Sequence, residues 1–144
     1  MFSKACEYGI RAATYIAMQS IDGRRVSLNE ISGEIDSPTA FTAKILQQLS
    51  RNGIIDATKG ANGGYGMSST DIKKTTLSQI VFAIDGDNIY AGCGLGLKEC
   101  NAEKPCPVHD KFVFIRDNLR QMLENTSLHE MTLGLATGLT YLKR

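Results

Sequence analysis

Apolar side chains recur at intervals of three and four residues along most of the chain, which is the spacing of an amphipathic helix. Residues 2–20 carry such a stripe at Cys6, Ile10, Ala13 and Ala17. Similar stripes lie in residues 38–52, in residues 76–85 and, over a longer stretch, in residues 107–125. The pattern therefore predicts four amphipathic helices, with loops or shorter elements between them.

Capping residues predict where the shorter elements begin. Ser27 and Glu30 have the spacing of a capping box, so a short helix is expected from there to about Gly33. Ser37 followed by Pro38 predicts the N-cap and the first residue of the next helix. These two short helices would be joined by a tight turn.

The apolar spacing changes after the glycine at position 53. Residues 54–69 contain two short extended runs around a turn rich in glycine and asparagine, which predicts a small β-hairpin. Two short helices followed by such a hairpin are typical of a winged helix-turn-helix, in which the second helix enters the major groove of DNA. A second capping box at Ser127 and Glu130 predicts a last helix or turn near the C-terminus.

Composition and charge narrow the possibilities further. With 144 residues the chain is long enough for one domain with a core of its own. The net charge is only +1, but residues 37–66 hold Lys44, Arg51 and Lys59 against Asp56 alone. The start has no signal-peptide pattern and no apolar run approaches a membrane span, so a cytoplasmic protein without membrane partners is expected. Paired carboxylates, a nucleophile elbow and a phosphate loop are not found in the sequence, so an enzyme with a small-molecule substrate is not expected.

Residues 92–110 hold three of the four cysteines and one of the two histidines. Their order is Cys93, Cys100, Cys106 and then His109. Clustered cysteines in a reducing cytosol are more often metal ligands or redox sensors than disulfides. The spacing matches neither a zinc knuckle nor a ferredoxin and leaves the metal open, although a long glycine-rich loop favours something larger than one ion. A thiol redox switch and a zinc site remain alternatives.

Five stretches and the cysteine-rich loop that follows them carry a resemblance to a known family. They are SKACEYGIRAATYIA, SLNEIS, FTAKILQQLSRNGII, KGANGGYGMS and TLSQIVFAIDG. In this order they resemble the Rrf2 family of bacterial transcriptional regulators. The resemblance implies a homodimer on double-stranded DNA, mainly α-helical with a hairpin wing, and not an enzyme. It implies a DNA-binding domain in residues 1–85, followed in residues 86–144 by a sensor loop (92–109) and a long C-terminal dimerisation helix.

The resemblance also implies which residues contact the operator. Family members place base-contacting and phosphate-contacting side chains on the exposed face of the second short helix, and the wing approaches the DNA closely. The expected DNA-binding residues are Lys4, Ser37, Thr39, Thr42, Lys44, Lys59, Gly63 and Gly64. The apolar residues Phe41, Ile45 and Leu49 should instead face the core. The wing glycines could alternatively do no more than allow the turn.

Family members that hold a two-iron, two-sulfur cluster use three cysteines and a histidine three residues after the last cysteine. The resemblance therefore implies Cys93, Cys100, Cys106 and His109 as ligands of an iron-sulfur cluster, with 2Fe-2S favoured over 4Fe-4S. In members with a four-iron centre the fourth ligand is an acidic residue before a tyrosine of the first helix, which here is Glu7.

Two neighbouring residues of the first helix have simpler interpretations. Glu7 could instead pair with Arg11, four residues further along the helix. Cys6 lies on the apolar stripe and is expected in the core.

The expected function is a transcriptional regulator, with a repressor favoured, that binds DNA under the control of the cluster and senses cluster status, redox state or nitric oxide. The alternative is a cluster-free regulator that uses its cysteines as a thiol switch or zinc site, or that responds to a partner protein.

Overall fold

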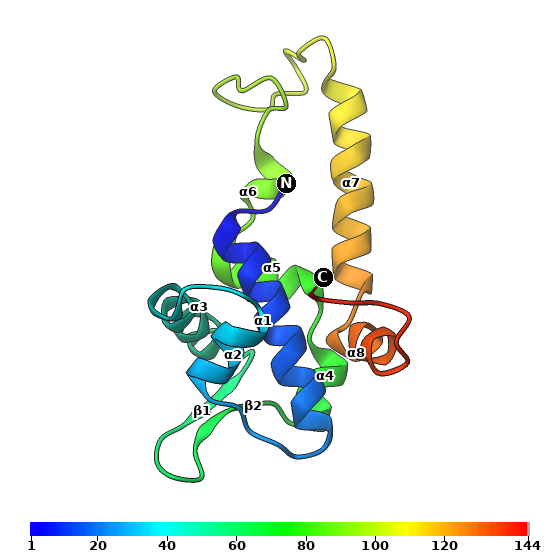
Figure 1. Cartoon of the computed structure of the whole chain (residues 1–144). Coiled ribbons are helices and arrows are strands. Elements are labelled where there is room, and N and C mark those ends of the chain that lie inside the picture. The colour runs from blue at the N-terminus through cyan, green and yellow to red at the C-terminus, as the bar shows by residue number, and fades with distance from the viewer. Residues whose placement is uncertain (144) are drawn as a thin grey trace.

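The computed structural model describes residues 1–143, which form a mainly helical domain with one two-stranded hairpin (Figure 1). The helices of these residues are α1 (Lys4–Ile21), α2 (Leu28–Glu34), α3 (Thr39–Arg51), α4 (Ser69–Lys74), α5 (Leu77–Asp85), α6 (Asn88–Ala91), α7 (His109–Asn125) and α8 (Leu128–Ala136). The strands are β1 (Asp56–Thr58) and β2 (Gly64–Gly66). The predicted mainly α fold with a small β-hairpin wing is confirmed.

Helix α1 forms the centre of the domain. It begins after Ser3, whose hydroxyl accepts a hydrogen bond from the backbone N–H of Cys6. Six consecutive residues of α1, 12–17, are buried, because α3, α5 and α8 pack around this helix. Cys6 is fully buried in this core, as the apolar stripe predicts. At Gly9 a side chain would collide with Ile84 of α5, so the two helices approach closely there.

Helices α2 and α3 and the hairpin form the predicted winged helix-turn-helix. The strands pair antiparallel, with Ala57 opposite Tyr65. Tyr65 also exchanges two backbone hydrogen bonds with Val26, of 3.0 and 2.8 Å, which ties the hairpin to the segment between α1 and α2. The wing is therefore attached to the domain along one side.

Only one half of the predicted capping box at Ser27 is present. The Ser27 hydroxyl accepts from the backbone N–H of Glu30 at 3.2 Å. The Glu30 carboxylate does not reach back to Ser27; it accepts a hydrogen bond of 3.0 Å from the Tyr15 hydroxyl and pairs with Arg24. The Ser127 hydroxyl caps α8 in the same way, accepting from the backbone N–H of Glu130 at 3.1 Å.

The predicted cap of α3 is wrong by one residue. The N-cap is Pro38, and the first residue of the helix is Thr39. The Ser37 hydroxyl bonds the hydroxyl of Thr42 and not a backbone N–H of the first turn. The backbone N–H of Thr42 instead donates to the Pro38 carbonyl at 2.9 Å, as in any helix.

Two short helices were not expected from the apolar pattern. Helix α4 follows the wing and begins at a serine cap, since the Ser68 hydroxyl accepts from the backbone N–H of Asp71 at 3.1 Å. Helix α6 is a single turn between α5 and the cysteine loop. Both are too short for an amphipathic stripe to be visible in the sequence.

Helix α7 packs on α5 and α6, and residues 92–108 lie at its N-terminal end (Figure 1). Near its C-terminal end it is anchored by Leu123, which is fully buried. Its predicted start at Pro107 shifts to His109. Within residues 1–143, no helix combines the length and apolar character needed to cross a membrane.

Candidate DNA-binding surface and cysteine loop

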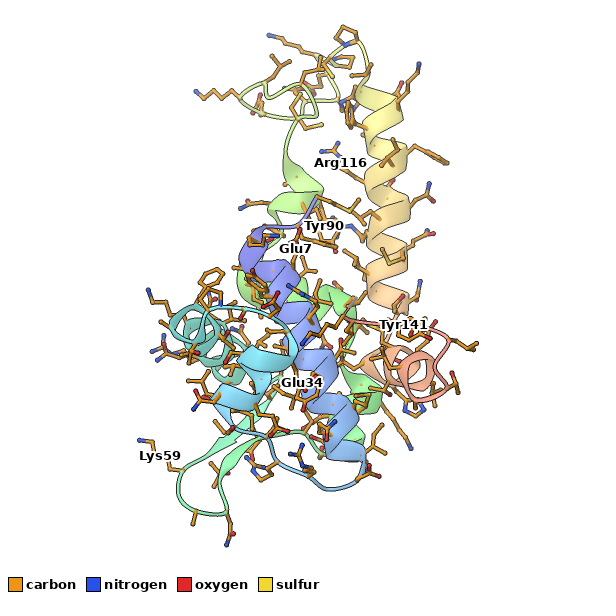
Figure 2. The ribbon with its side chains drawn as sticks, in the orientation of Figure 1. Glu7, Glu34, Lys59, Tyr90, Arg116 and Tyr141 are labelled. Carbon is orange, nitrogen blue, oxygen red and sulfur yellow. The ribbon has the colours of Figure 1, made fainter. Side chains whose placement is uncertain are left out.

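A groove of about 600 Å³ runs between the exposed face of α3 and the wing. Its lining includes Lys44, Gln47 and Arg51 from α3, and Lys59 and Tyr65 from the hairpin. We call it the recognition groove. Figure 2 shows the Lys59 side chain extending from the wing into solvent. Recognition helices present such a face to the major groove while a wing lies along the backbone, so its position suits a duplex.

The recognition groove carries positive charge. Lys44, Arg51 and Lys59 are exposed, and among the described residues none of them takes part in an ion pair. The one acidic residue nearby, Asp56, pairs with Arg25 at 2.9 Å. Its charge is thereby offset, so the groove retains a cationic surface of the kind that attracts phosphates.

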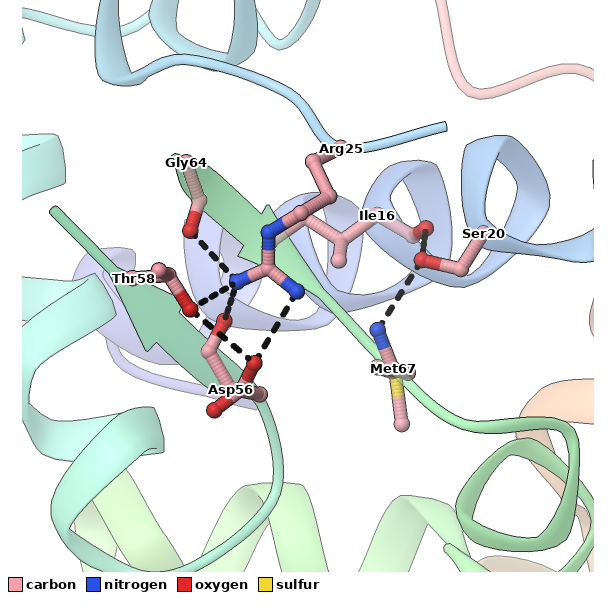
Figure 3. Close-up of polar contacts among 7 residues, drawn as sticks. All are labelled: Ile16, Ser20, Arg25, Asp56, Thr58, Gly64 and Met67. Carbon is pink, nitrogen blue, oxygen red and sulfur yellow. Dashed lines mark hydrogen bonds and ion pairs between the residues drawn. The ribbon is translucent and has the colours of Figure 1, made fainter. Parts of the chain in front are cut away.

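Arg25 fixes the base of the wing, which the sequence did not reveal (Figure 3). Its Nη2 donates to the carbonyls of Asp56 and Gly64 at 3.1 and 2.7 Å and to the Thr58 hydroxyl at 3.0 Å. The Arg25 side chain thus joins both strands of the hairpin. No local pattern predicts these contacts, because the partners lie 31 to 39 residues further along the chain.

A second contact joins the wing to α1. The Ser20 hydroxyl accepts from the backbone N–H of Met67 at 3.0 Å and donates to the Ile16 carbonyl at 2.7 Å, as Figure 3 shows. The strand that leaves the wing is therefore held by the last turns of the central helix.

Glycine is required at two of the predicted DNA-binding positions for reasons internal to the wing. Gly64 has a φ of +112°, and a side chain there would lie 2.7 Å from the Val26 carbonyl oxygen. At Gly63 a side chain would lie 2.3 Å from the Thr58 carbonyl oxygen. Both glycines therefore permit the tight hairpin, which is the alternative role that the sequence suggested beside DNA contact.

The expectation that Thr42 is exposed on α3 is wrong. Its side chain is fully buried, and its hydroxyl donates to the Pro38 carbonyl at 2.9 Å and bonds the Ser37 hydroxyl. Thr42 therefore cannot reach a base. Thr39 and Lys44 are exposed as expected, and Gln47 is a further exposed polar residue of the same helix that the sequence did not single out.

Lys4 lies beside an aromatic pair that connects α1 with the start of α3. The Tyr8 and Phe41 rings pack edge to face with centroids 5.7 Å apart, and the Arg11 guanidinium lies 4.8 Å from the Tyr8 centroid. Glu7 pairs with Lys4 at 2.9 Å and not with Arg11, the pairing that the sequence suggested. The hydrogen bond from Lys4 holds the pKa of Glu7 below its usual value.

The cysteine loop, residues 92–109, brings its four predicted ligands together in two pairs. The Cys100 sulfur lies 3.4 Å from Nδ1 of His109, and Cys93 lies near Cys106. Backbone N–H groups, first that of Leu95, hold the pKa of Cys93 below its usual value. The three thiols are partly exposed, unlike Cys6.

The two pairs do not converge on one point. Within residues 1–143, no three side chains of His, Cys, Asp or Glu are close enough together to hold a single metal ion. Three thiols and an imidazole are nevertheless the donor set that iron-sulfur clusters take, and a cluster is larger than an ion. By their chemistry and their common loop, the residues fit such a group.

The fold and the recognition groove define a winged helix-turn-helix DNA-binding protein. The model of the Rrf2 family, described as "Iron-dependent Transcriptional regulator", matches residues 2–133, so the chain belongs to the Rrf2 family. Members of this family are transcriptional regulators and not enzymes.

Individual relatives are distant. A "Putative HTH-type transcriptional regulator" of Aquifex aeolicus is 26% identical over 133 residues, which are 91% of this chain and 90% of that protein. CymR, the global cysteine regulator of B. subtilis, has a similar structure, with a TM-score of 0.75 and 20% identity over 92% of this chain and 96% of CymR. IscR of T. potens gives a TM-score of 0.74 and 15% identity over 98% of this chain and 92% of IscR. At these identities the structures support the fold.

Proposed function

We propose that the protein is a homodimeric repressor whose binding to its operator is controlled by an iron-sulfur cluster in the cysteine loop. The observation that carries the proposal is the placement of Cys93, Cys100, Cys106 and His109 in two pairs on one loop at the end of α7. The chain belongs to a family of transcriptional regulators, and such a loop would link a chemical signal to the helix that is expected to join the two subunits.

The DNA half of the proposal rests on the recognition groove. Lys44, Gln47 and Arg51 would face the major groove from α3, and Lys59 would contact the backbone from the wing. At the start of α3, the exposed Thr39 and the backbone of Ser37 would lie at a phosphate. Lys4, from the start of α1, would reach the flanking backbone.

The dimer half rests on α7. Phe114, Ile115 and Met122 are 68%, 59% and 47% exposed, although α7 packs on α5 and α6 of its own domain. Apolar side chains gathered in this way are covered when a second copy packs against them. Ile115→Glu should therefore give a monomer in light scattering. Asp117→Lys, an exposed charge reversal two residues from Ile115 and therefore on a different side of the helix, should leave the dimer intact.

The sensor half rests on the donor chemistry. A bound cluster would supply a redox-active and nitric-oxide-reactive centre, and this chain would hold it through the three thiolates and the His109 imidazole. A neutral imidazole ligand can be protonated and released, so the fourth ligand would be the labile one. Glu7, carried on α1 outside the loop, remains the alternative fourth ligand if it comes from a second subunit.

Anaerobic reconstitution tests the sensor half. Iron and acid-labile sulfide are counted per subunit, and binding to the DNA upstream of the protein's own gene is measured with and without the cluster. Alanine at Cys93, Cys100 or Cys106 should lower bound iron and abolish the difference in DNA affinity, whereas Cys6→Ala should change neither. Full iron content in all three loop variants would refute the assignment.

A thiol switch is the second candidate, favoured by the proximity of Cys93 and Cys106. Oxidation by hydrogen peroxide would remove two protons and two electrons from these thiols, forming one disulfide and two waters. Treatment of the metal-free protein should then lower the mass of the peptide pair by two hydrogens and change DNA affinity. A colourless protein with this response would favour the switch over the cluster.

A further inference from the structure

Arg116 lies on the face of α7 that carries the cysteine loop, seven residues or two turns after His109. Its guanidinium makes two contacts with that loop. Nη2 donates to the Cys100 sulfur at 3.0 Å, and Nη1 donates to the Gly92 carbonyl, one residue before Cys93. One side chain thus holds the loop at two points that are eight residues apart in the sequence.

The same face of α7 contacts the loop a third time. Gly94 packs on the ring of Phe112, so closely that a side chain at this position would lie 2.4 Å from the ring. Together with His109 beside the Cys100 sulfur, these contacts run along positions 109, 112 and 116 of the helix. This spacing is one face of an α-helix, so the loop rests on α7 along two turns.

We propose that Arg116 is a positioning residue that holds the cysteine loop against α7 and donates to the sulfur of Cys100 whether or not an inorganic group is bound. A guanidinium suits this task because its rigid planar fork holds two N–H donors apart for two acceptors, whereas the N–H groups of an ammonium all lie on one nitrogen. When the loop carries a cluster, which rests on the proposed function, the same N–H group would stabilise negative charge on the ligating sulfur. Such donors favour the reduced form of a cluster.

The first experiment uses the reduced, metal-free protein. Trypsin cleavage after Lys98, which is exposed within the loop, reports how often the loop leaves α7. Arg116→Gln should speed this cleavage about tenfold, because it removes both contacts. Arg120→Gln is the matched control: it removes one tryptic site of the same helix, while its guanidinium lies over Tyr90, 4.3 Å from the ring centroid. Equal cleavage rates in the two variants would overturn the proposal.

The second experiment measures the midpoint potential of the reconstituted cluster. Arg116→Gln should lower it by about 59 mV, a tenfold loss of preference for the reduced form in a one-electron couple. Arg116→Lys, which keeps a donor for the sulfur, should have a midpoint potential close to that of the wild type. Trypsin should still cleave its loop faster than that of the wild type. A midpoint potential that is unchanged in Arg116→Gln, or shifted equally in Arg120→Gln, would overturn the proposed effect of Arg116 on the cluster. Should the wild-type protein bind no cluster, the proposed function fails, and the cleavage result still decides the role of Arg116.

Discussion

The contacts of Arg25 make the wing a sensitive target for mutation. Arg25→Met keeps the length of the side chain but removes the ion pair to Asp56 and the three hydrogen bonds to the hairpin. Nη2 carries two hydrogens and has three acceptors, so only about two of these hydrogen bonds act at full strength. Each contributes about 1 kcal/mol to the stability of the closed wing. The ion pair adds about 0.5 kcal/mol, because the Asp56 side chain is 67% exposed.

The sum is about 2.5 kcal/mol, which shifts the opening equilibrium of the wing about 70-fold. The backbone bonds between Val26 and Tyr65 remain, so part of the wing stays attached. The freed Asp56 carboxylate also faces the phosphates that the recognition groove is proposed to bind. We therefore expect operator affinity to fall about tenfold, with a loss of up to about 2.5 kcal/mol in the free energy of unfolding, because the unfolded chain lacks the same contacts.

Fluorescence anisotropy with operator DNA measures this loss, and two further variants interpret it. Arg24→Met removes the same charge and an exposed ion pair with Glu30, but has no contact with the hairpin, so it should bind nearly as the wild type does. Asp56→Asn added to Arg25→Met should recover part of the affinity. If Arg25→Met and Arg24→Met lose affinity equally, the wing contacts contribute nothing beyond net charge and the reasoning is refuted.

Three further predictions concern single residues. Burial raises the pKa of Cys6 to about 12, so Cys6 should resist alkylation at pH 8 in the native protein while the other three thiols react. Because the thiol of the unfolded chain ionises near pH 9.0, the free energy of unfolding should fall as the pH rises from 9.0 toward 12. Urea titrations of Cys6→Ala should lack this part of the pH dependence, and a profile equal to that of the wild type would contradict the burial of an un-ionised Cys6 thiol. Gln47→Ala should weaken binding to the operator by about 1–3 kcal/mol but leave non-specific binding unchanged; equal losses on both would make Gln47 a mere backbone contact. Lys59→Gln should lower the slope of log affinity against log salt by about two for a dimer, and an unchanged slope would exclude Lys59 from the phosphates.

The order of elements was predictable because its signals are local. Helix spacing, the serine caps at 27 and 127 and the glycine-rich turn each act within a few residues, and α2, α8 and the wing appear where these signals place them. Helix α4 also has a local signal, since Ser68 and Asp71 have cap spacing, but the hairpin pattern before it concealed this.

The rest depends on contacts between distant parts of the chain. Thr42 belongs to a polar helix start in the sequence, yet the packing of α3 against α1, α2 and α5 leaves its side chain fully buried. Glu30 has the spacing of a capping box, but Tyr15 and Arg24 bind its carboxylate. Arg116 follows the cysteine loop without any motif, and only the packing of that loop on α7 brings it to Cys100. Such partners are selected by tertiary geometry, which local patterns do not record.

The most direct measurement is the affinity of the purified protein for its own operator, taken anaerobically with the reconstituted cluster and again after iron removal. The account predicts at least a tenfold change between the two states in the wild type. It predicts no change in a variant with alanine at Cys93, Cys100 and Cys106. Equal affinity in both states of the wild type would contradict control of DNA binding by the cysteine loop.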